Sequence, residues 1–191
     1  SIDVTVTGGA GLITYSWSNG ANSEDLFDLS AGLYTVTATD QNGYSVSMEV
    51  EITETEEMAI SATWSDYTGY GVSCSGANDG SIDVTVTGGT GNYTYSWMSG
   101  SAMIGGSEDL SDLPAGMYSV TATDENGCSV SMEVEITETE EMTISATWSD
   151  YTGYGVSCNG ANDGSIDVTV TGGTGNYTYS WSNGSESEDL S

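Results

Sequence analysis

The sequence contains no lysine, no arginine and no histidine, whereas aspartate and glutamate together number 29, which gives a formal net charge of −29. Without cationic side chains, the chain has no surface that could neutralise phosphates. We therefore expect no nucleic-acid partner and no attachment to anionic lipid. Salt bridges between side chains are excluded as well, so the carboxylates must be solvated, hydrogen-bonded, protonated or paired with cations from solution.

The same absences remove most catalytic chemistry. No histidine or lysine is available as a general base near neutral pH, which excludes Ser–His and Cys–His nucleophiles, Schiff bases and P-loop phosphate binding. Paired carboxylates are the only catalytic groups left, and no arrangement of them recurs as a convergent site. We therefore expect that the chain is not an enzyme, and no cofactor is implied with certainty.

Long apolar runs are also missing. No stretch reaches the length that spans a bilayer, and no signal peptide is visible, so we expect no direct membrane insertion of this segment. The sequence begins inside a repeated unit at Ser1 and stops at Ser191 inside another copy. We interpret it as part of a longer protein.

What the sequence does contain is a tandem repeat. The stretch SIDVTVTGG occurs three times, starting at Ser1, Ser81 and Ser165. A period of about 80 residues has the size of one small domain and indicates a modular protein. We predict three domains: a partial copy without its first strand at 1–57, a complete copy at 58–141, and a partial copy without its C-terminal strands at 142–191.

The complete copy alternates apolar and polar residues with period two. The alternation covers residues 58–64, 81–87, 93–97, 118–122 and 128–137, with Gly, Asn and Asp turn signals between them. Such a pattern predicts half-buried strands, and no segment has a sustained helical period. Six or seven short strands in about 84 residues, with an early tryptophan, are typical of a small antiparallel sandwich. We predict an all-β fold of tandem immunoglobulin-like antiparallel β-sandwich domains in an extended array.

A turn followed by a strand-opening tyrosine adds detail to this fold. Leu113-Pro114-Ala115-Gly116-Met117-Tyr118 resembles the tyrosine corner of immunoglobulin-like domains, in which the hydroxyl bonds back to the turn backbone. Tyr34 occupies the same place in the first copy. The alternative, that Tyr118 is simply a core residue, is compatible with the same sandwich.

Four blocks recur in a fixed order: VSCxGANDGSIDV, GGTGNYTYSW, DLxAGxY and TDxNGC. They resemble the SprB-type repeat of very large surface adhesins from gliding and marine Bacteroidetes. Asn92 and Asn176 replace the proline that is usual in this repeat, and Tyr44 stands where the next copy has Cys128. The resemblance implies an exported cell-surface filament that touches external surfaces, and it supports adhesion more strongly than gliding.

We therefore predict the structural stalk of a secreted, extracellular cell-surface adhesin. Its expected partners are neighbouring repeats of the same chain and external surfaces or glycans. One alternative is a glycan-binding module that uses Trp64, Trp148 and the aromatic stretch DYTGYG after each. Another is a self-assembling extracellular filament subunit, whose chains associate laterally or by strand exchange.

The three cysteines leave several pairings open. An exterior location favours disulfides, and the simplest pairing is Cys74 with Cys128 inside one domain, leaving Cys158 to a cysteine outside this sequence. In an immunoglobulin-like strand order, however, these two positions belong to loops at opposite ends of a sandwich. A disulfide needs Cα atoms within about 7 Å. Bridges between neighbouring domains and free thiols are the alternatives.

Acidic residues gather in the predicted loops and at the domain junction, where oxygen ligands suit Ca²⁺. No spacing matches an EF-hand, and Asp and Asn are also ordinary turn residues. The Ca²⁺-ligand candidates are Asp79, Asp124, Asn126, Glu138, Glu140 and Asp163.

Overall fold

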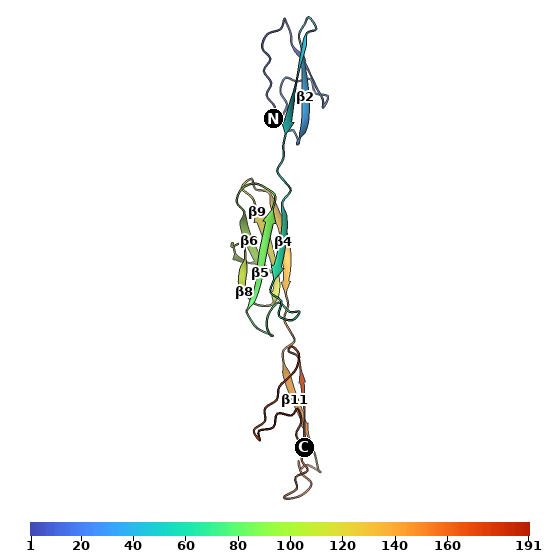
Figure 1. The fold of residues 1–191 in the computed structure, drawn as a ribbon, viewed down its shortest axis with the longest axis vertical. Helices are drawn as coiled ribbons and strands as arrows, with labels where there is room; N and C mark the ends of the chain where they lie inside the picture. Colours follow the sequence, from blue (N-terminus) through green and yellow to red (C-terminus); the bar gives the residue numbers. More distant parts are fainter. The chain divides into compact units, whose positions relative to one another are not determined.

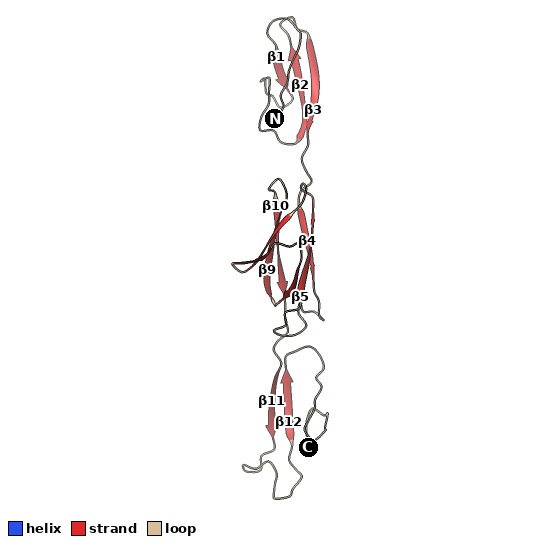
Figure 2. Cartoon of the chain, turned by 90° about the vertical axis from the view of Figure 1, so that its left-hand side faces the viewer, coloured by secondary structure: helices blue, strands red, loops and turns tan.

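The computed structural model describes residues 1–191 and consists of strands, turns and loops (Figure 2). The predicted all-β class is confirmed. None of its elements is a helix of the length and hydrophobicity needed to cross a membrane. Internal packing divides the chain into Ser1–Glu56 and Glu57–Ser191. We call residues 1–57, 58–141 and 142–191 the first, second and third repeats; this three-domain division stays a prediction.

The second repeat folds as a sandwich of two antiparallel sheets (Figure 1). One sheet has the strand order β4-β5-β8 and the other the order β10-β9-β6-β7. The strands are β4 (Ala59–Trp64), β5 (Gly80–Thr87), β6 (Thr94–Ser99), β7 (Ala102–Gly105), β8 (Leu110–Leu113), β9 (Gly116–Thr123) and β10 (Ser129–Ile136). The first, second and fifth strands face the remaining four, which is an immunoglobulin-like arrangement.

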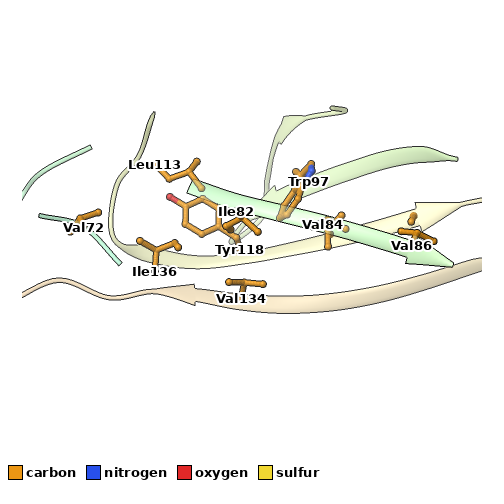
Figure 3. Close-up of a cluster of buried hydrophobic side chains, with 11 residues drawn as sticks. Val72, Ile82, Val84, Val86, Trp97, Leu113, Tyr118, Val134 and Ile136 are labelled. Carbon is orange, nitrogen blue, oxygen red and sulfur yellow. The ribbon is translucent and has the colours of Figure 1, made fainter. Parts of the chain in front are cut away.

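The core of this sandwich follows from the period-two pattern. Along β5, Ile82, Val84 and Val86 are buried while the residues between them are exposed. Trp97 and Tyr118 join the same cluster from the other sheet (Figure 3). Full burial of a side chain of this size contributes about 1.5–3 kcal/mol, so these alternating positions hold the two sheets together.

The predicted tyrosine corner is present in two repeats. The Tyr118 hydroxyl donates a hydrogen bond to the Pro114 carbonyl oxygen at 2.8 Å, and the Tyr34 hydroxyl donates to the Ser30 carbonyl oxygen at 3.0 Å. Burial raises the pKa of Tyr118. The hydroxyl thus fixes the turn before β9 to the strand that follows it.

The first repeat forms a single sheet of order β1-β2-β3, with β1 (Thr14–Trp17), β2 (Gly32–Thr39) and β3 (Ser45–Ile52). Its own small core contains Ile2, Trp17 and Leu26. Residues 2–7 correspond to β5 in sequence, but their only ladder contact is the bridge between Ile2 and Leu26. No counterpart of β4 lies beside them.

The third repeat contains one two-stranded sheet of β11 (Thr143–Trp148) and β12 (Ile166–Thr171). Its register repeats that of β4 and β5, because Trp148 lies opposite Ile166 as Trp64 lies opposite Ile82. The bridge between Ile166 and Leu190 also repeats that of the first repeat. Nearly identical sequences therefore give the same local pairing in separate copies.

Candidate functional site: the loop that holds the exit segment

The loop between β4 and β5, residues 65–79, is closed by its own side chains. The Ser65 hydroxyl donates to the Gly71 carbonyl oxygen at 2.5 Å and accepts a hydrogen bond from the Ser81 N–H at 3.0 Å. Asp66 Oδ1 accepts the Gly69 N–H at 2.6 Å. These short-range bonds give the loop a defined shape that does not depend on a regular ladder.

This loop binds the segment that leaves the domain, residues 137–141, which we call the exit segment. The Thr137 carbonyl oxygen accepts hydrogen bonds from the N–H groups of Gly71 and Val72 at 2.9 and 3.1 Å. The Gly76 N–H donates to Glu138 Oε2 at 2.7 Å. The chain therefore leaves the sandwich through a hydrogen-bonded contact with a loop near the domain's start, more than 60 residues earlier.

Close packing accompanies these bonds. Val72 and Ile136 are fully buried in the same cluster, at one end of the core (Figure 3). A Cβ atom at Gly71 would lie 2.8 Å from Ile136 Cγ2 and 3.0 Å from the Thr137 nitrogen. Only glycine allows the loop backbone to come this close to the end of β10.

The third repeat shows the same loop without an exit segment against it. Val156, the counterpart of the fully buried Val72, is 37% exposed, and Tyr154 is 73% exposed where Tyr70 is 36% exposed. The internal hydrogen bonds persist, since the Ser149 hydroxyl still donates to the Gly155 carbonyl oxygen. The loop thus has the same internal hydrogen bond in both repeats, and in the second repeat Val72 is buried in the cluster that contains Ile136.

The loop also presents the aromatic residues that the sequence singled out as glycan contacts. Trp64 is 51% exposed, and Tyr67 and Tyr70 are partly exposed on the same loop. Between them Thr68 has φ of 58°, a left-handed conformation that is unusual for a β-branched residue, and Thr152 repeats it at 53°. In both copies, therefore, two exposed tyrosines lie on a loop with a left-handed threonine, and this loop directly follows the exposed tryptophan that ends β4 or β11.

The aspartates among the Ca²⁺ candidates accept hydrogen bonds from nearby backbone. Asp79 Oδ1 accepts the Ser73 N–H, and Asp163 Oδ1 accepts the Ser157 N–H, both at 3.0 Å. Hydrogen bonds from the hydroxyl and the N–H of Ser73 lower the pKa of Asp79, and Ser157 acts on Asp163 in the same way. Each of these two carboxylates thus accepts a hydrogen bond from the loop that precedes it and stabilises that loop.

Asp124 is buried, and its carboxylate joins two turns. Its Oδ2 accepts the Thr90 N–H at 2.9 Å, while its Oδ1 accepts the N–H groups of Asn126 and Cys128 at 3.0 and 2.8 Å. Asp40 makes the equivalent bonds in the first repeat. Burial would raise the pKa of Asp40, but the backbone N–H groups outweigh it and lower that pKa.

The other candidates are dispersed. The side chain of Glu138 bonds the Gly76 N–H, and Glu140 is exposed beyond it, whereas Asn126 lies in the turn with Asp124. No three Asp, Glu, His or Cys side chains gather into a group that could hold a metal ion. Calcium binding by the predicted residues stays a prediction.

The structure does not form the predicted disulfide, and all three cysteines are exposed free thiols. Cys74 belongs to the loop that contacts the exit segment after β10, whereas Cys128 directly precedes β10. The eight residues of β10 separate these ends by about 26 Å at 3.3 Å per residue, far beyond the reach of a disulfide.

Sequence reasoning missed a carboxylate that supports the core. Asp109 Oδ1 accepts the Val84 N–H at 2.9 Å, and Asp25 and Asp189 bond Val4 and Val168 in the same way. The bond lies where the pairing of β5 and β8 shifts register. The threefold recurrence of Ser-Glu-Asp-Leu was the signal that could have revealed it.

A second recurrent hydrogen bond joins a tyrosine of strand β6 to Glu108, the residue before Asp109. The Tyr95 hydroxyl donates to Glu108 Oε1 at 3.1 Å, and Tyr15 and Tyr179 make the same bond to Glu24 and Glu188. Burial, together with the neighbouring Glu108 carboxylate, raises the pKa of Tyr95 to about 12. The neutral phenol is therefore favoured in the folded state.

Comparison with known proteins finds a family that matches part of each copy of the repeat. The SprB repeat family matches residues 1–22, 72–102 and 156–186, which confirms the resemblance seen in the sequence blocks. No protein of curated function matches the chain. The matched segments include the SIDVTVTGG stretch of every copy.

Three solved structures are similar to this chain. The three N-terminal domains of the bacteriophage RB49 highly immunogenic outer capsid protein (Hoc) share 19% identity with a TM-score of 0.47, over 90% of this chain and 63% of that one. The amphioxus IgVJ-C2 molecule shares 14% identity with a TM-score of 0.36, over 71% and 94%. A Dscam structure shares 18% identity with a TM-score of 0.32, over 66% and 38%. The immunoglobulin-like assignment rests on the strand order described above.

Proposed function

This chain carries three SprB repeats, and on that basis we propose that it is part of the stalk of a secreted cell-surface adhesin. SprB repeats occur in cell-surface proteins. In this proposal the repeats project an adhesive region away from the cell, and their task is mechanical. Attachment to surfaces is the main role, and gliding along them is a further one.

The observation that carries the proposal is the contact between the 65–79 loop and the exit segment. Tension along a stalk enters the second repeat at β4 and leaves it at Thr137. The hydrogen bonds of Gly71 and Val72 to Thr137, and of Gly76 to Glu138, tie these two ends together. Tension must break this contact before β10 can separate from the sandwich, so the contact suits a load-bearing domain.

Composition supports the same function. The charge of −29 makes the chain repel itself and resist collapse. The absence of lysine and arginine leaves no site for trypsin-like proteases. Near-identical copies suit a spacer, because a module with its own ligand would differ from its neighbours at a binding loop.

Single-molecule force spectroscopy of the full chain tests the proposal. Glu138→Ala removes the carboxylate that accepts the Gly76 N–H, and Gly71→Ala forces Ile136 and Thr137 away from the loop. Both variants should lower the unfolding force of the second repeat, residues 58–141, which is recognised by an extended length of about 29 nm less the end-to-end length of the folded domain. Glu135→Ala, an exposed charge on β10, is the matched control and should leave that force unchanged. Equal forces in all four proteins would contradict a load-bearing role of this contact.

A glycan-binding module is the second candidate function. It is favoured by the partly exposed Trp64, Tyr67 and Tyr70 around the strained Thr68. Aromatic rings bind the apolar faces of sugars, and a chain of this charge would select neutral glycans over anionic ones. Binding of the chain to a glycan array, lost in Trp64→Ala and retained in Met103→Ala, would support this function. If the chain binds no glycan on the array, the glycan-binding function is rejected and the stalk remains the proposed function.

A further inference from the structure

The first two repeats differ in length at one place, the hairpin of β6 and β7. The first repeat has four residues fewer between its tryptophan and its corner tyrosine, and it has no counterpart of β7. The second repeat uses the extra residues to fold Ala102–Gly105 back against β6. The core does not need this addition, because the indole N–H of the tryptophan makes the same hydrogen bond in both repeats. The hairpin is therefore available for a contact outside its own domain.

Strand β7 is an edge strand. The order β10-β9-β6-β7 leaves one side of β7 without a neighbouring strand. Its pairing with β6 is irregular as well: Met98 lies opposite Met103 and Trp97 opposite Gly105, so the ladder skips Ile104. An edge strand presents a row of N–H and C=O groups that can pair with a strand of another chain. Strand β7 thus has backbone groups available for an intermolecular ladder.

The side chains of β7 are apolar and uncovered. Met103 is 68% exposed and Ile104 is 42% exposed. Met98, which lies opposite Met103 on β6, is only partly covered. Burial of apolar surface is the main favourable term in protein association, and contiguous exposed apolar residues mark interaction sites. The edge of β7 therefore combines available backbone groups with an apolar surface.

The hairpin is also uncharged, in a chain with a net charge of −29. Residues 84–107 contain no Asp or Glu. The other exposed apolar side chains of the second repeat have carboxylates near them. Met117 lies opposite Glu135 in the ladder of β9 and β10, and Tyr67 directly follows Asp66. Two such chains can therefore meet at the edge of β7 without bringing their carboxylates together.

We propose that β7 pairs with β7 of a second copy of this chain. The pair is antiparallel about a two-fold axis, so Met103 lies opposite Ile104 of the other copy and the two four-stranded sheets join edge to edge. The charges favour a second copy as the occupant, because its own edge is apolar and uncharged in the same way. A cationic partner would instead be attracted to the acidic faces of the molecule. This association does not depend on the stalk function.

The contact is small, because β7 has four residues. A stable dimer typically buries about 800 Å² on each partner, and an edge of this length buries much less. The irregular pairing at Ile104 restricts the new ladder further. We therefore expect single chains to associate with a Kd of about 1 mM. Chains held side by side should associate more strongly, because their effective concentration is higher.

Static light scattering of the full chain tests the proposal. Measurements in about 1 M NaCl shorten the Debye length to about 3 Å, which screens the repulsion between chains. The weight-average mass should be about 1.5-fold that of the single chain at about 1 mM protein. It should not exceed that of a dimer at any concentration, because a two-fold contact closes on itself. A chain that stays monomeric over this range overturns the proposal.

Two variants identify the surface involved. Met103→Glu combined with Ile104→Glu places charges on the edge at exposed positions, so the fold should survive, as circular dichroism would verify. Deletion of residues 101–104 shortens the hairpin to the length found in the first repeat. Both proteins should remain monomeric. Met117→Glu is the matched control, because Met117 is an exposed methionine on β9, and it should associate like the parent. Association that persists in either edge variant overturns the proposal.

Cross-linking identifies the occupant. The three exposed cysteines are first replaced by serine, and chains with Met103→Cys are then mixed with chains that have Ile104→Cys. Residues directly opposite each other on paired strands lie within reach of a disulfide. Oxidation by glutathione disulfide should therefore join position 103 of one chain to position 104 of the other several-fold faster than it joins either to Met117→Cys. Equal rates overturn a second copy as the occupant.

Discussion

The carboxylate of Asp109 accepts the backbone N–H of Val84 at 2.9 Å, although 25 residues separate the two in sequence. The bond replaces a ladder hydrogen bond where β5 and β8 shift register. Asp109→Ala should leave this partly buried N–H without a partner, at a cost of about 1–3 kcal/mol. Hydrogen exchange at Val84 should accelerate accordingly. Asp83→Ala, on the exposed face of β5, should change it little, and equal protection in both variants would contradict the role of Asp109.

The carboxylate of Asp79 predicts a loss of stability in acid. Hydrogen bonds from Ser73 lower its pKa in the folded state. A lowered folded pKa stabilises the protein above the unfolded value of about 3.9 and loses that effect as pH falls through the folded value. The difference in Tm between the parent and Asp79→Ala should therefore shrink below about pH 4. The difference is the quantity to follow, because acid also relieves the repulsion of the whole chain. A constant difference down to pH 2 would count against this bond.

The raised pKa of Tyr95 predicts a loss of stability in alkali. Its pKa is raised to about 12 by burial and by Glu108, whereas an unfolded tyrosine ionises near pH 10. The stabilising effect is complete below about pH 10 and is lost as pH rises toward the folded value. A titration of phenolate absorbance should therefore contain a component that ionises near pH 12 and is missing in Tyr95→Phe. Its persistence in the variant would assign it to another tyrosine.

The cysteines should remain chemically independent within one chain. Because β10 separates Cys74 from Cys128, we expect all three thiols to react with a thiol reagent in the folded protein without prior reduction. Mild oxidation should produce only bonds between chains, seen as higher masses on a non-reducing gel. An oxidised monomer in which peptide mapping joins Cys74 to Cys128 would refute this.

Melting curves with added Ca²⁺ and with EGTA test the metal hypothesis. Asp79, Asp124 and Asp163 already accept backbone N–H groups, so a bound Ca²⁺ would have to use their remaining oxygen lone pairs. If it does, the curve with Ca²⁺ should lie at a higher Tm than the curve with EGTA, because a ligand bound only by the folded state raises Tm. The difference should disappear in Asp124→Asn if Asp124 is a ligand, and coincident curves of the parent would refute the predicted site.

The long strands could be predicted because their apolar residues alternate over at least five positions. The expected segments 58–64, 81–87 and 128–137 correspond to β4, β5 and β10. The four-residue strands β7 and β8 were missed, because so short a segment has no measurable period. The tyrosine corner was predictable since a local turn positions both of its partners.

The functions of the acidic residues were not predictable in the same way. Asp109 and Asp124 bond backbone that is distant in sequence, and only the packing of the two sheets shows which N–H groups lack a ladder partner. The cysteine pairing failed because Cys74 and Cys128 both stand in loops outside the strands, and the length of β10 separates those loops.

Strand β7 has a further consequence. The second repeat has four more residues between its tryptophan and its corner tyrosine than the first, and they extend β6 into a hairpin with β7. The Trp97 indole N–H still donates to the Ser107 carbonyl oxygen at 2.9 Å, as Trp17 does to Ser23 at 2.8 Å. This hairpin tip is therefore a place where the second repeat tolerates foreign sequence, and an epitope or a short peptide ligand inserted there would be displayed at one fixed point of that domain.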